Sequence, residues 1–353
     1  MNINTANVTY SSIVAIGEEV NLLEKNSGDK YLKLHRGVMD VCDIDLNKLN
    51  IDLNLNDKKT QQYGGNDGST DLINTIKTKF KLNGDVIITP GGMAALDLLI
   101  NSLSEYVFHI PTYHWGSWNK ILKTHNKWLS TFDDMDLENF KPTNGVVMLC
   151  YPSNPTGYCP DINIIKNFLT YSKNSNITVI LDLPYYFLYN NDNELSEFLF
   201  DNVILVSSFS KSIGLSGYRI GYTNTRNSEL FKTLRIRSLY KYNSISTLPQ
   251  YIINELLLED NIINEYKNKT IQNISNNIKF LKFYDFLYDG YKSDPIGPFA
   301  IVKLSYSKLI ENKISSVPLS KFTLDKIEGI ENLSRISLAV DHDLFTKYFK
   351  SLI

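Results

Sequence analysis

The stretch SSFSKSIGLSGYRIGY, residues 207–222, is the most informative part of the sequence. It follows an apolar run that is typical of a buried strand, so Lys211 comes just after a strand end. Ser208 and Ser210 precede this lysine, and Arg219 follows it by eight residues. A lysine in this setting can hold an aldehyde as a Schiff base, while the hydroxyls and the guanidinium bind a phosphate. The alternative is a surface lysine in a Ser/Gly loop.

The composition is that of an ordinary globular protein. The 353 residues suffice for about two domains with a large buried core. Hydrophobic residues make up 43% and charged residues 21%, which argues against disorder. A formal charge of -2 favours neither nucleic acid nor an anionic membrane. No apolar run approaches the roughly 20 residues that a membrane span needs, so we expect no nucleic-acid and no membrane partner.

Cysteine and histidine usage limits the redox and metal chemistry. Cys42, Cys150 and Cys159 are widely separated and odd in number, which favours neither a disulfide framework nor a zinc site. The five histidines form no spaced ligand pair. The first residues lack the order of a secretory signal. We therefore expect a cytoplasmic protein with reduced thiols and no metal.

The segment from about residue 84 to 223 alternates β-branched runs with amphipathic stretches. This alternation predicts an α/β fold with a doubly wound, mainly parallel sheet that is covered by helices on both faces. Such sheets bind ligands at the carboxyl ends of their strands. The expected strands are 86–89, 106–110, 128–131, 146–150, 178–182 and 203–207, and the helices between them are 93–104, 114–125 and 162–172.

After residue 225 the pattern changes to long helical stretches followed by a short mixed segment. The expected helices are 228–242, 249–284 and 343–352, and the expected strands are 299–304 and 335–339. We predict a large ligand-binding domain over residues 46–248. A smaller α+β domain is expected from both termini, 1–45 and 249–353.

The lysine segment resembles the signature of class I/II aminotransferases, which are fold-type-I enzymes dependent on pyridoxal 5′-phosphate (PLP). The resemblance is patchwise from about residue 31 to 340. It implies a large domain with a mostly parallel seven-stranded sheet, a small domain and a homodimer. It also implies that Lys211 forms the Schiff base with PLP, with Ser208, Ser210 and Arg219 at the cofactor phosphate.

Two further motifs match family segments that surround the PLP ring. YPSNPTGY resembles the Asn-Pro-Thr-Gly motif, which implies that Asn154 binds the phenolic oxygen and approaches the substrate carboxylate. The alternative is a simple Pro/Gly turn. LDLPYYFL implies that Asp182 pairs with the pyridine nitrogen and that Tyr185 donates to the ring oxygen. The two residues after Asp182 depart from the Asp-Glu-Ala-Tyr that many members have.

Two glycine- and aromatic-containing motifs complete the expected cofactor site. TPGGMAAL reads as a strand, a turn and a helix start, whose N–H groups can hold a phosphate. The resemblance places Gly92 and Met93 in contact with it. PTYHW resembles the segment whose aromatic ring stacks on PLP, which implies Tyr113. His114 and Trp115 are the neighbouring alternatives.

Three matches concern the substrate and the second subunit. Tyr63, in YGGNDGSTDLI, resembles the tyrosine that reaches the PLP phosphate of the other subunit, which implies composite sites in a homodimer. Gly37, in KLHRGVMD, resembles a glycine that lies against the substrate. Arg335, in SRISLAV, resembles the arginine that binds the α-carboxylate, for which a planar guanidinium is well suited. The alternatives are a loop tyrosine, a turn glycine and a salt-bridged surface arginine.

The expected reaction is transamination between an amino acid and a 2-oxo acid, with Lys211 moving the proton. The same apparatus serves PLP-dependent lyases, decarboxylases and cyclising enzymes, and the sequence does not separate these. A PLP-binding regulator is a further hypothesis, although the residues of the cofactor motifs are all present. The segment 318–322 departs from the family pattern, which leaves the substrate class open. His35, Arg36 and Lys241 are candidates for binding a second anionic group.

Overall fold

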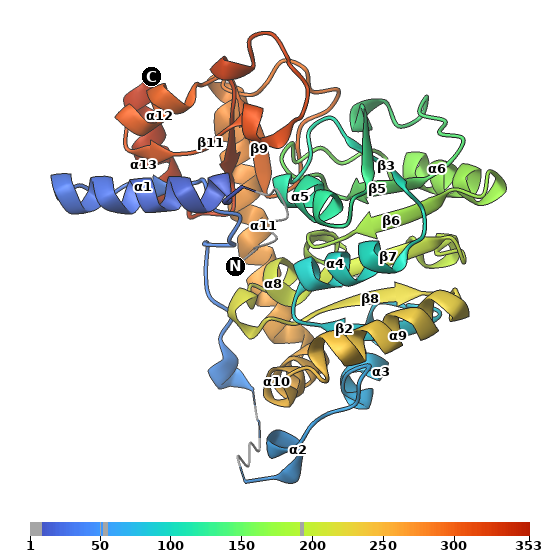
Figure 1. Cartoon of the computed structure of the whole chain (residues 1–353). Helices are drawn as coiled ribbons and strands as arrows, with labels where there is room; N and C mark the ends of the chain where they lie inside the picture. The colour runs from blue at the N-terminus through green and yellow to red at the C-terminus, as the bar shows by residue number, and fades with distance from the viewer. Residues whose placement is uncertain (1–8, 50, 52–55, 191–193) are drawn as a thin grey trace, which may run out of the picture.

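A mostly parallel sheet forms the centre of the computed structural model, which describes residues 9–49, 51, 56–190 and 194–353 (Figure 1). Among the described strands of this sheet, only one runs against its neighbours, the strand of residues 221–225. The sheet order is β2 (Asp85–Thr89), β8 (Gly221–Thr225), β7 (Val203–Ser208), β6 (Thr178–Asp182), β5 (Val146–Cys150), β3 (Val107–Pro111) and β4 (Trp128–Phe132). The predicted α/β fold with a seven-stranded sheet is confirmed. Strand β8 was not among the six strands expected from the sequence, because its buried residues include Thr223, Asn224 and Thr225 rather than an apolar run.

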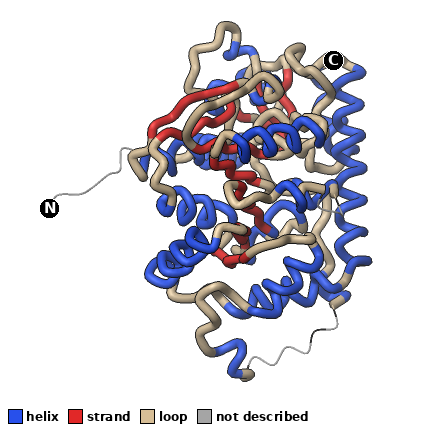
Figure 2. The backbone as a smooth tube through the Cα atoms, turned by 90° about the vertical axis from the view of Figure 1, so that its right-hand side faces the viewer, coloured by secondary structure: helices blue, strands red, loops and turns tan. Residues whose placement is uncertain are grey.

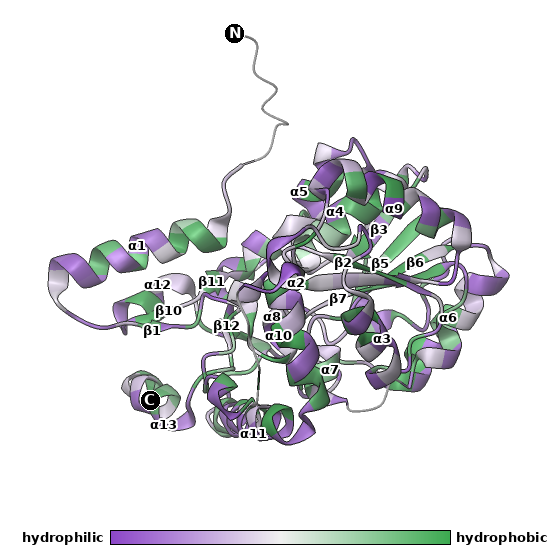
Figure 3. Cartoon of the chain, turned by 90° about the horizontal axis from the view of Figure 1, so that it is seen from below, coloured by the Kyte–Doolittle hydropathy of each residue, from purple (hydrophilic) through white to green (hydrophobic). Residues whose placement is uncertain are grey.

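Helices cover both faces of this sheet, as Figure 2 shows. Within β5, Val147 and Leu149 join one core layer, while Val146 and Met148 join the other. Because both faces are buried, β5 and β6 are apolar over most of their length, and β3, β5 and β6 are coloured as hydrophobic in Figure 3. One layer contains α4 (Gly92–Ser102), α5 (Gly116–Thr124) and α9 (Ser228–Tyr242), and the other contains α3 (Thr70–Lys79), α6 (Ile162–Asn174) and α10 (Thr247–Leu258).

A smaller α+β unit packs at one end of the sheet. Its three-stranded antiparallel sheet has the order β11 (Val317–Pro318), β12 (Ser334–Ser337), β9 (Phe299–Val302). The N-terminal strand β1 (Leu32–Lys33) pairs with β10 (Ile314–Ser315), so residues from both ends of the chain lie in this unit. Helices α12 (Tyr306–Glu311) and α13 (His342–Phe349) cover it.

Helix α11 (Asp260–Phe283) connects the two units. Ile262 and Ile263 pack in the core beneath the large sheet, whereas Ile274 and Leu281 pack in the core of the smaller unit. The single helix expected over 249–284 is therefore two helices, since Glu259 leaves the helical conformation between α10 and α11. Helix α10 packs in the core of the large sheet, although the sequence predicts residues 249–353 in the small domain. The domain boundary at residue 248 stays a prediction.

The N-terminal helix α1 (Ser12–Ser27) lies across the smaller unit (Figure 1). Ile16 and Val20 are buried against Val317 and Phe322. The apolar spacing of three and four residues in this segment is the sequence signal for such a helix. The helix ends at Gly28, whose left-handed backbone lets its N–H donate to the carbonyl of Glu24.

A close backbone contact fixes the two units against each other. Gly157, in the turn after β5, has a φ of +68° and lies against the carbonyl of Phe299 in β9. A Cβ at residue 157 would lie 1.9 Å from that oxygen, which no rotamer change relieves. Only glycine allows this approach between the large sheet and the smaller one.

Gly157→Ala is expected to reduce the free energy of unfolding by at least about 2 kcal/mol, because strain at positive φ adds to overpacking. Gly28→Ala is the matched control, since Gly28 has a φ of +74° and no neighbour within 4 Å of an added Cβ. The control should lose only about 1 kcal/mol. Urea unfolding of both variants measures the difference. Equal losses in the free energy of unfolding would show that the contact with Phe299 does not contribute to the destabilisation.

Candidate active site

A pocket of about 260 Å³ opens at the carboxyl ends of β5, β6 and β7, where a doubly wound sheet binds its ligands. The start of α4 also lines it, and the smaller unit contributes Arg335 from β12. Eleven of the thirteen residues expected at the site line it: Gly37, Gly92, Met93, Asn154, Asp182, Tyr185, Ser208, Ser210, Lys211, Arg219 and Arg335. The two that do not are Tyr63 and Tyr113.

Lys211 enters this pocket from the one-turn helix α8 (Phe209–Ser212), directly after the fully buried strand β7. Desolvation by the surrounding protein, together with the smaller effect of the positive charges of Arg219, Arg335 and Arg36, lowers the pKa of its amine to about 8. A larger fraction of this amine is therefore neutral near physiological pH than for an exposed lysine. A neutral amine is the form that attacks a carbonyl.

One end of the pocket gathers groups that bind anions. Arg219 donates from Nη1 to the carbonyl of Ser216 at 2.8 Å and lies 3.5 Å from Oγ of Ser210. Gly92 begins helix α4, and a Cβ built on it would contact Ser208 at 3.6 Å. A helix N-terminus, hydroxyls and a guanidinium converge here, which is the arrangement that binds a phosphate.

Asn154 and Tyr185 both line the pocket. The side-chain nitrogen of Asn154 donates to the hydroxyl of Tyr185 at 3.5 Å. Within the described residues, the side-chain oxygen of Asn154 is buried without a hydrogen-bond partner. Because a buried polar group without a partner is costly, this amide is suited to a ligand that supplies one.

Asp182 lies at the end of β6 and is 6% exposed. Burial raises the pKa of its carboxyl group to about 7, and a hydrogen bond from the indole of Trp118 opposes that rise. The Nε1–Oδ2 distance is 3.1 Å. This contact is not readable from the sequence, because a tryptophan on an apolar helix face has the pattern of an ordinary core residue.

Arg335 in β12 is completely buried. Its guanidinium carbon lies 4.7 Å from the ring centre of Phe299 and 5.0 Å from that of Phe322. Nη2 donates to the carbonyl of His35 at 3.1 Å, while Nε and Nη1 have no partner within the described residues. Burial lowers the pKa of this group to about 10, so it stays charged. Two free donors on a buried cation are suited to a carboxylate or phosphate.

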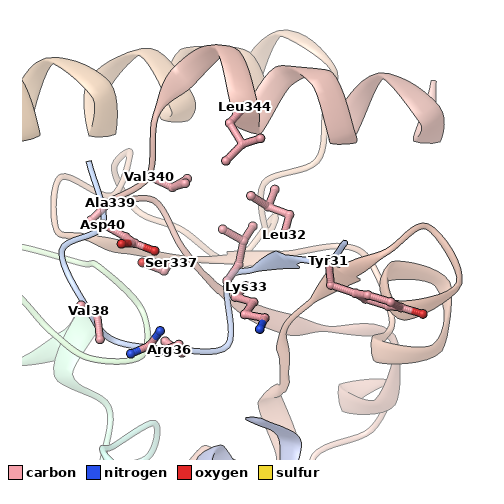
Figure 4. Close-up of a pocket in the computed structure, with 11 residues that line it drawn as sticks. Tyr31, Leu32, Lys33, Arg36, Val38, Asp40, Ser337, Ala339, Val340 and Leu344 are labelled. Carbon is pink, nitrogen blue, oxygen red and sulfur yellow. The ribbon is translucent and has the colours of Figure 1, made fainter. Parts of the chain in front are cut away.

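None of the three candidates for a second anionic group is among the residues that line this pocket. Arg36 lines a separate cavity of about 150 Å³ beside α13, together with Val38 and Asp40 (Figure 4). His35 is buried, its Nδ1 lies 2.6 Å from Oγ of Ser315, and burial lowers its pKa to about 4. Lys241 forms an ion pair with Asp97.

Tyr113 does not line the pocket. Its ring lies in the apolar cluster that α1 forms with the smaller unit, and burial together with Tyr288 raises its pKa to about 12. The turn after β3 is held by a hydrogen bond from the backbone N–H of His114 to the carbonyl of Phe322 at 2.8 Å. With the turn in this conformation, Trp115 lines the pocket and Tyr113 does not. Tyr113 as the ring-stacking residue stays a prediction, and its neighbour Trp115 is the aromatic side chain of this motif that lines the pocket.

Tyr63 is 85% exposed and lies in an open surface hollow, beside residues 244–247 and outside the pocket of Lys211. Among the described residues, no group of three or more His, Cys, Asp or Glu side chains is arranged to hold a metal ion. Every helix in the same part of the chain is too short or too polar to cross a membrane.

The residues of the pocket fit PLP. The cluster at Arg219 suits its phosphate, the buried carboxylate of Asp182 suits its pyridine nitrogen, and the unpartnered amide of Asn154 suits its phenolic oxygen. The amine of Lys211 is placed to react with its aldehyde. The free donors of Arg335 remain for the substrate.

Comparison with known proteins agrees with this fit. The family model "Aminotransferase class I and II" matches residues 31–348. The chain is 27% identical over 284 residues to a histidinol-phosphate aminotransferase of Thermoanaerobacter, covering 79% of this chain and 74% of that protein. It is 22% identical over 231 residues to an aspartate aminotransferase of Thermococcus kodakarensis, covering 62% and 59%. The fold is similar to that of Thermus thermophilus aspartate aminotransferase with maleate, with a TM-score of 0.82, 16% identity and coverage of 100% and 99%.

The chain therefore belongs to the class I and II aminotransferase family. It is an enzyme, a PLP-dependent aminotransferase.

Gly91→Ala is expected to weaken PLP binding at least about tenfold, which corresponds to about 1.4 kcal/mol. Gly91 has a φ of +90°, and a Cβ there would lie 2.5 Å from Nη2 of Arg219, so the guanidinium has to shift from its position at the anion-binding end. Fluorescence titration of cofactor-free protein with PLP measures the change. Gly329→Ala is the control, because Gly329 shares the positive φ but has no neighbour within 4 Å of an added Cβ. An unchanged affinity in Gly91→Ala would contradict the phosphate assignment.

Proposed function

We propose that this pocket transfers the amino group of a donor that carries an anionic group, and that Lys211 holds PLP covalently. The observation that supports this proposal most strongly is the buried guanidinium of Arg335, with two unpartnered N–H groups beside Lys211 and Asp182. A buried charge without a counter-ion is costly. An anionic substrate group at Arg335 relieves that cost and orients the donor.

We assign the following roles to the side chains. When bound, PLP supplies an aldehyde that takes up the amino group and a ring that accepts an electron pair. Asp182 holds a proton at the ring nitrogen. Lys211 forms the covalent link and, once released, takes the proton from the Cα atom of the donor. Arg335 fixes the donor so that this Cα–H bond faces the amine, which favours proton transfer over cleavage of the other bonds.

The apolar side chains that line the pocket favour a donor with an apolar portion. Ile13, Leu96 and Trp115 line it next to the charged groups. The names of the relatives include two kinds of anionic substrate, an amino acid with carboxylates and a compound with a phosphate. We therefore infer that the donor has one anionic end for Arg335 and a body that contacts these apolar side chains.

A panel of donors tests the reaction. Stoichiometric PLP-loaded enzyme is mixed with aspartate, phenylalanine, leucine or histidinol phosphate, without any acceptor. A true donor is expected to abolish the absorbance of the aldehyde form and to yield one equivalent of the matching carbonyl product. Added 2-oxoglutarate should restore the absorbance. Arg335→Lys should weaken the binding of the donor more than about tenfold, because the bidentate contact is lost.

The products distinguish the alternative reactions. Release of ammonia or carbon dioxide without consumption of an acceptor would identify a lyase or a decarboxylase and would contradict the proposed transamination. Failure of every anionic donor combined with turnover of an uncharged amine would contradict the role of Arg335.

We further propose a homodimer in which Tyr63 reaches the cofactor phosphate of the partner subunit. Tyr63 is 85% exposed, and helix α9 presents Ile236 and Tyr240 at 58% and 86% exposure. These two residues are four positions apart and therefore lie on one helix face. Exposed apolar side chains on a single face support a surface that another subunit covers.

Mixing two variants tests this shared site. Lys211→Ala and Tyr63→Phe are each expected to be impaired, the second because a hydrogen bond to a charged phosphate is lost, worth about 1.5–3 kcal/mol. In a mixed dimer, one site collects both lesions and the other is intact. After random subunit exchange, activity should rise toward about a quarter of the wild-type value. No rise after verified exchange would place Tyr63 outside the partner's site.

We propose the cytoplasm as the location of this enzyme. Cys42, Cys150 and Cys159 are all free thiols in the structure. Free cysteines are typical of a reducing compartment. Fractionation of cells that express the full chain would test this location.

A further inference from the structure

The indole of Trp118 is bound to the buried carboxylate of Asp182. Trp118 lies on the inner face of α5 and is 1% exposed. Its Nε1–H donates to Oδ2 of Asp182 at 3.1 Å. Among the described residues, it is the only side chain that the structure places within hydrogen-bond distance of this carboxylate.

The other groups around the carboxylate do not replace this donor. The thiol of Cys150 lies on the neighbouring strand opposite Asp182, but it donates to the carbonyl of Pro152. The hydroxyl of Tyr185 accepts a hydrogen bond from Asn154. Lys211 lines the same pocket without forming an ion pair with Asp182 within the described residues.

Packing alone does not require a tryptophan at residue 118. The side chain belongs to the apolar core layer that contains Ile110, Leu122 and Met148. A phenylalanine would fill most of the same space with apolar surface. What only tryptophan adds is an N–H group that is buried and points at a carboxylate, and buried polar groups of this kind need a partner.

We propose that Trp118 is a positioning residue for the cofactor: its indole N–H holds Asp182 ionised and keeps Oδ1 free for the protonated ring nitrogen. This inference rests on the proposed role of Asp182. A hydrogen bond to the charged form of a buried carboxylate favours that form. The indole donates to Oδ2, and Oδ1 accepts no side-chain hydrogen bond within the described residues, so Oδ1 is available to a ligand.

The test compares the affinity of cofactor-free protein for two ligands. The first is PLP, and the second is 1-deaza-PLP, whose ring has C–H in place of the nitrogen. Trp118→Phe removes the N–H and keeps most of the apolar volume. It is expected to raise the dissociation constant of PLP by about tenfold and that of the analogue by less than about twofold. Trp128→Phe is the control, because Trp128 is 62% exposed on the edge strand β4, and it should change neither constant.

A second variant keeps the shape of the side chain. Replacing residue 118 with 3-benzothienylalanine puts sulfur where the indole has N–H, and this variant should show the same selective loss for PLP. Thermal unfolding of each cofactor-free variant verifies the fold. The sulfur variant serves as the test if Trp118→Phe fails to fold.

Two results would overturn the inference. Equal weakening of both ligands would show that Trp118 acts only through packing, and unchanged binding of both would show that the hydrogen bond has no effect on the cofactor. Failure of the wild-type protein to bind PLP is a different result, because it would contradict the proposed function itself.

Discussion

Burial of charged side chains at one edge of the sheet, without ionic partners of their own, is the constraint on which this site depends. Within the described part of the chain, Lys211, Asp182 and Arg335 form no ion pair. Burial shifts the pKa of each side chain in the direction that favours its neutral form, to about 8 for Lys211, 7 for Asp182 and 10 for Arg335. Lys211 and Asp182 have pKa values near physiological pH, and two guanidinium nitrogens of Arg335 have no hydrogen-bond partner within the described residues. A ligand with complementary groups stabilises all three side chains at once.

The fold explains how these groups come together. Parallel strands end at the same edge, so residues that follow β5, β6 and β7 meet although they are far apart in the sequence. The smaller unit then covers this edge and brings in Arg335 between two aromatic rings. The close approach of Gly157 to Phe299 fixes the distance between the two units. The position of the substrate anchor relative to the lysine thus depends on backbone packing between separate sheets.

Much of this arrangement follows from the sequence because it depends on local signals. Apolar strands end at the lysine segment, at the Asn-Pro-Thr-Gly turn and at Asp182. The hydrophobic periodicity of a strand and the residues of a turn can both be recognised within a single segment. The six strands expected for the large sheet agree with the structure to within one residue at each end. Strand β8 was missed, because its Thr and Asn side chains lack the apolar pattern of a buried strand.

The parts that sequence could not predict depend on contacts between distant segments. Whether Tyr113 or Trp115 faces the pocket depends on a hydrogen bond between His114 and Phe322, more than 200 residues away in the chain. The bond from Trp118 to Asp182 joins a helix to a strand end, and an apolar helix pattern shows only that the indole is buried. Side-chain direction at such points is decided by tertiary packing.

The most direct test of the central claim is the identity of the lysine that carries PLP. The PLP-loaded enzyme is reduced with borohydride, digested, and analysed by mass spectrometry to locate the modified residue. The account predicts a single stoichiometric adduct on Lys211. An adduct on any other lysine, with Lys211 unmodified, would contradict the assignment of this pocket as the active site.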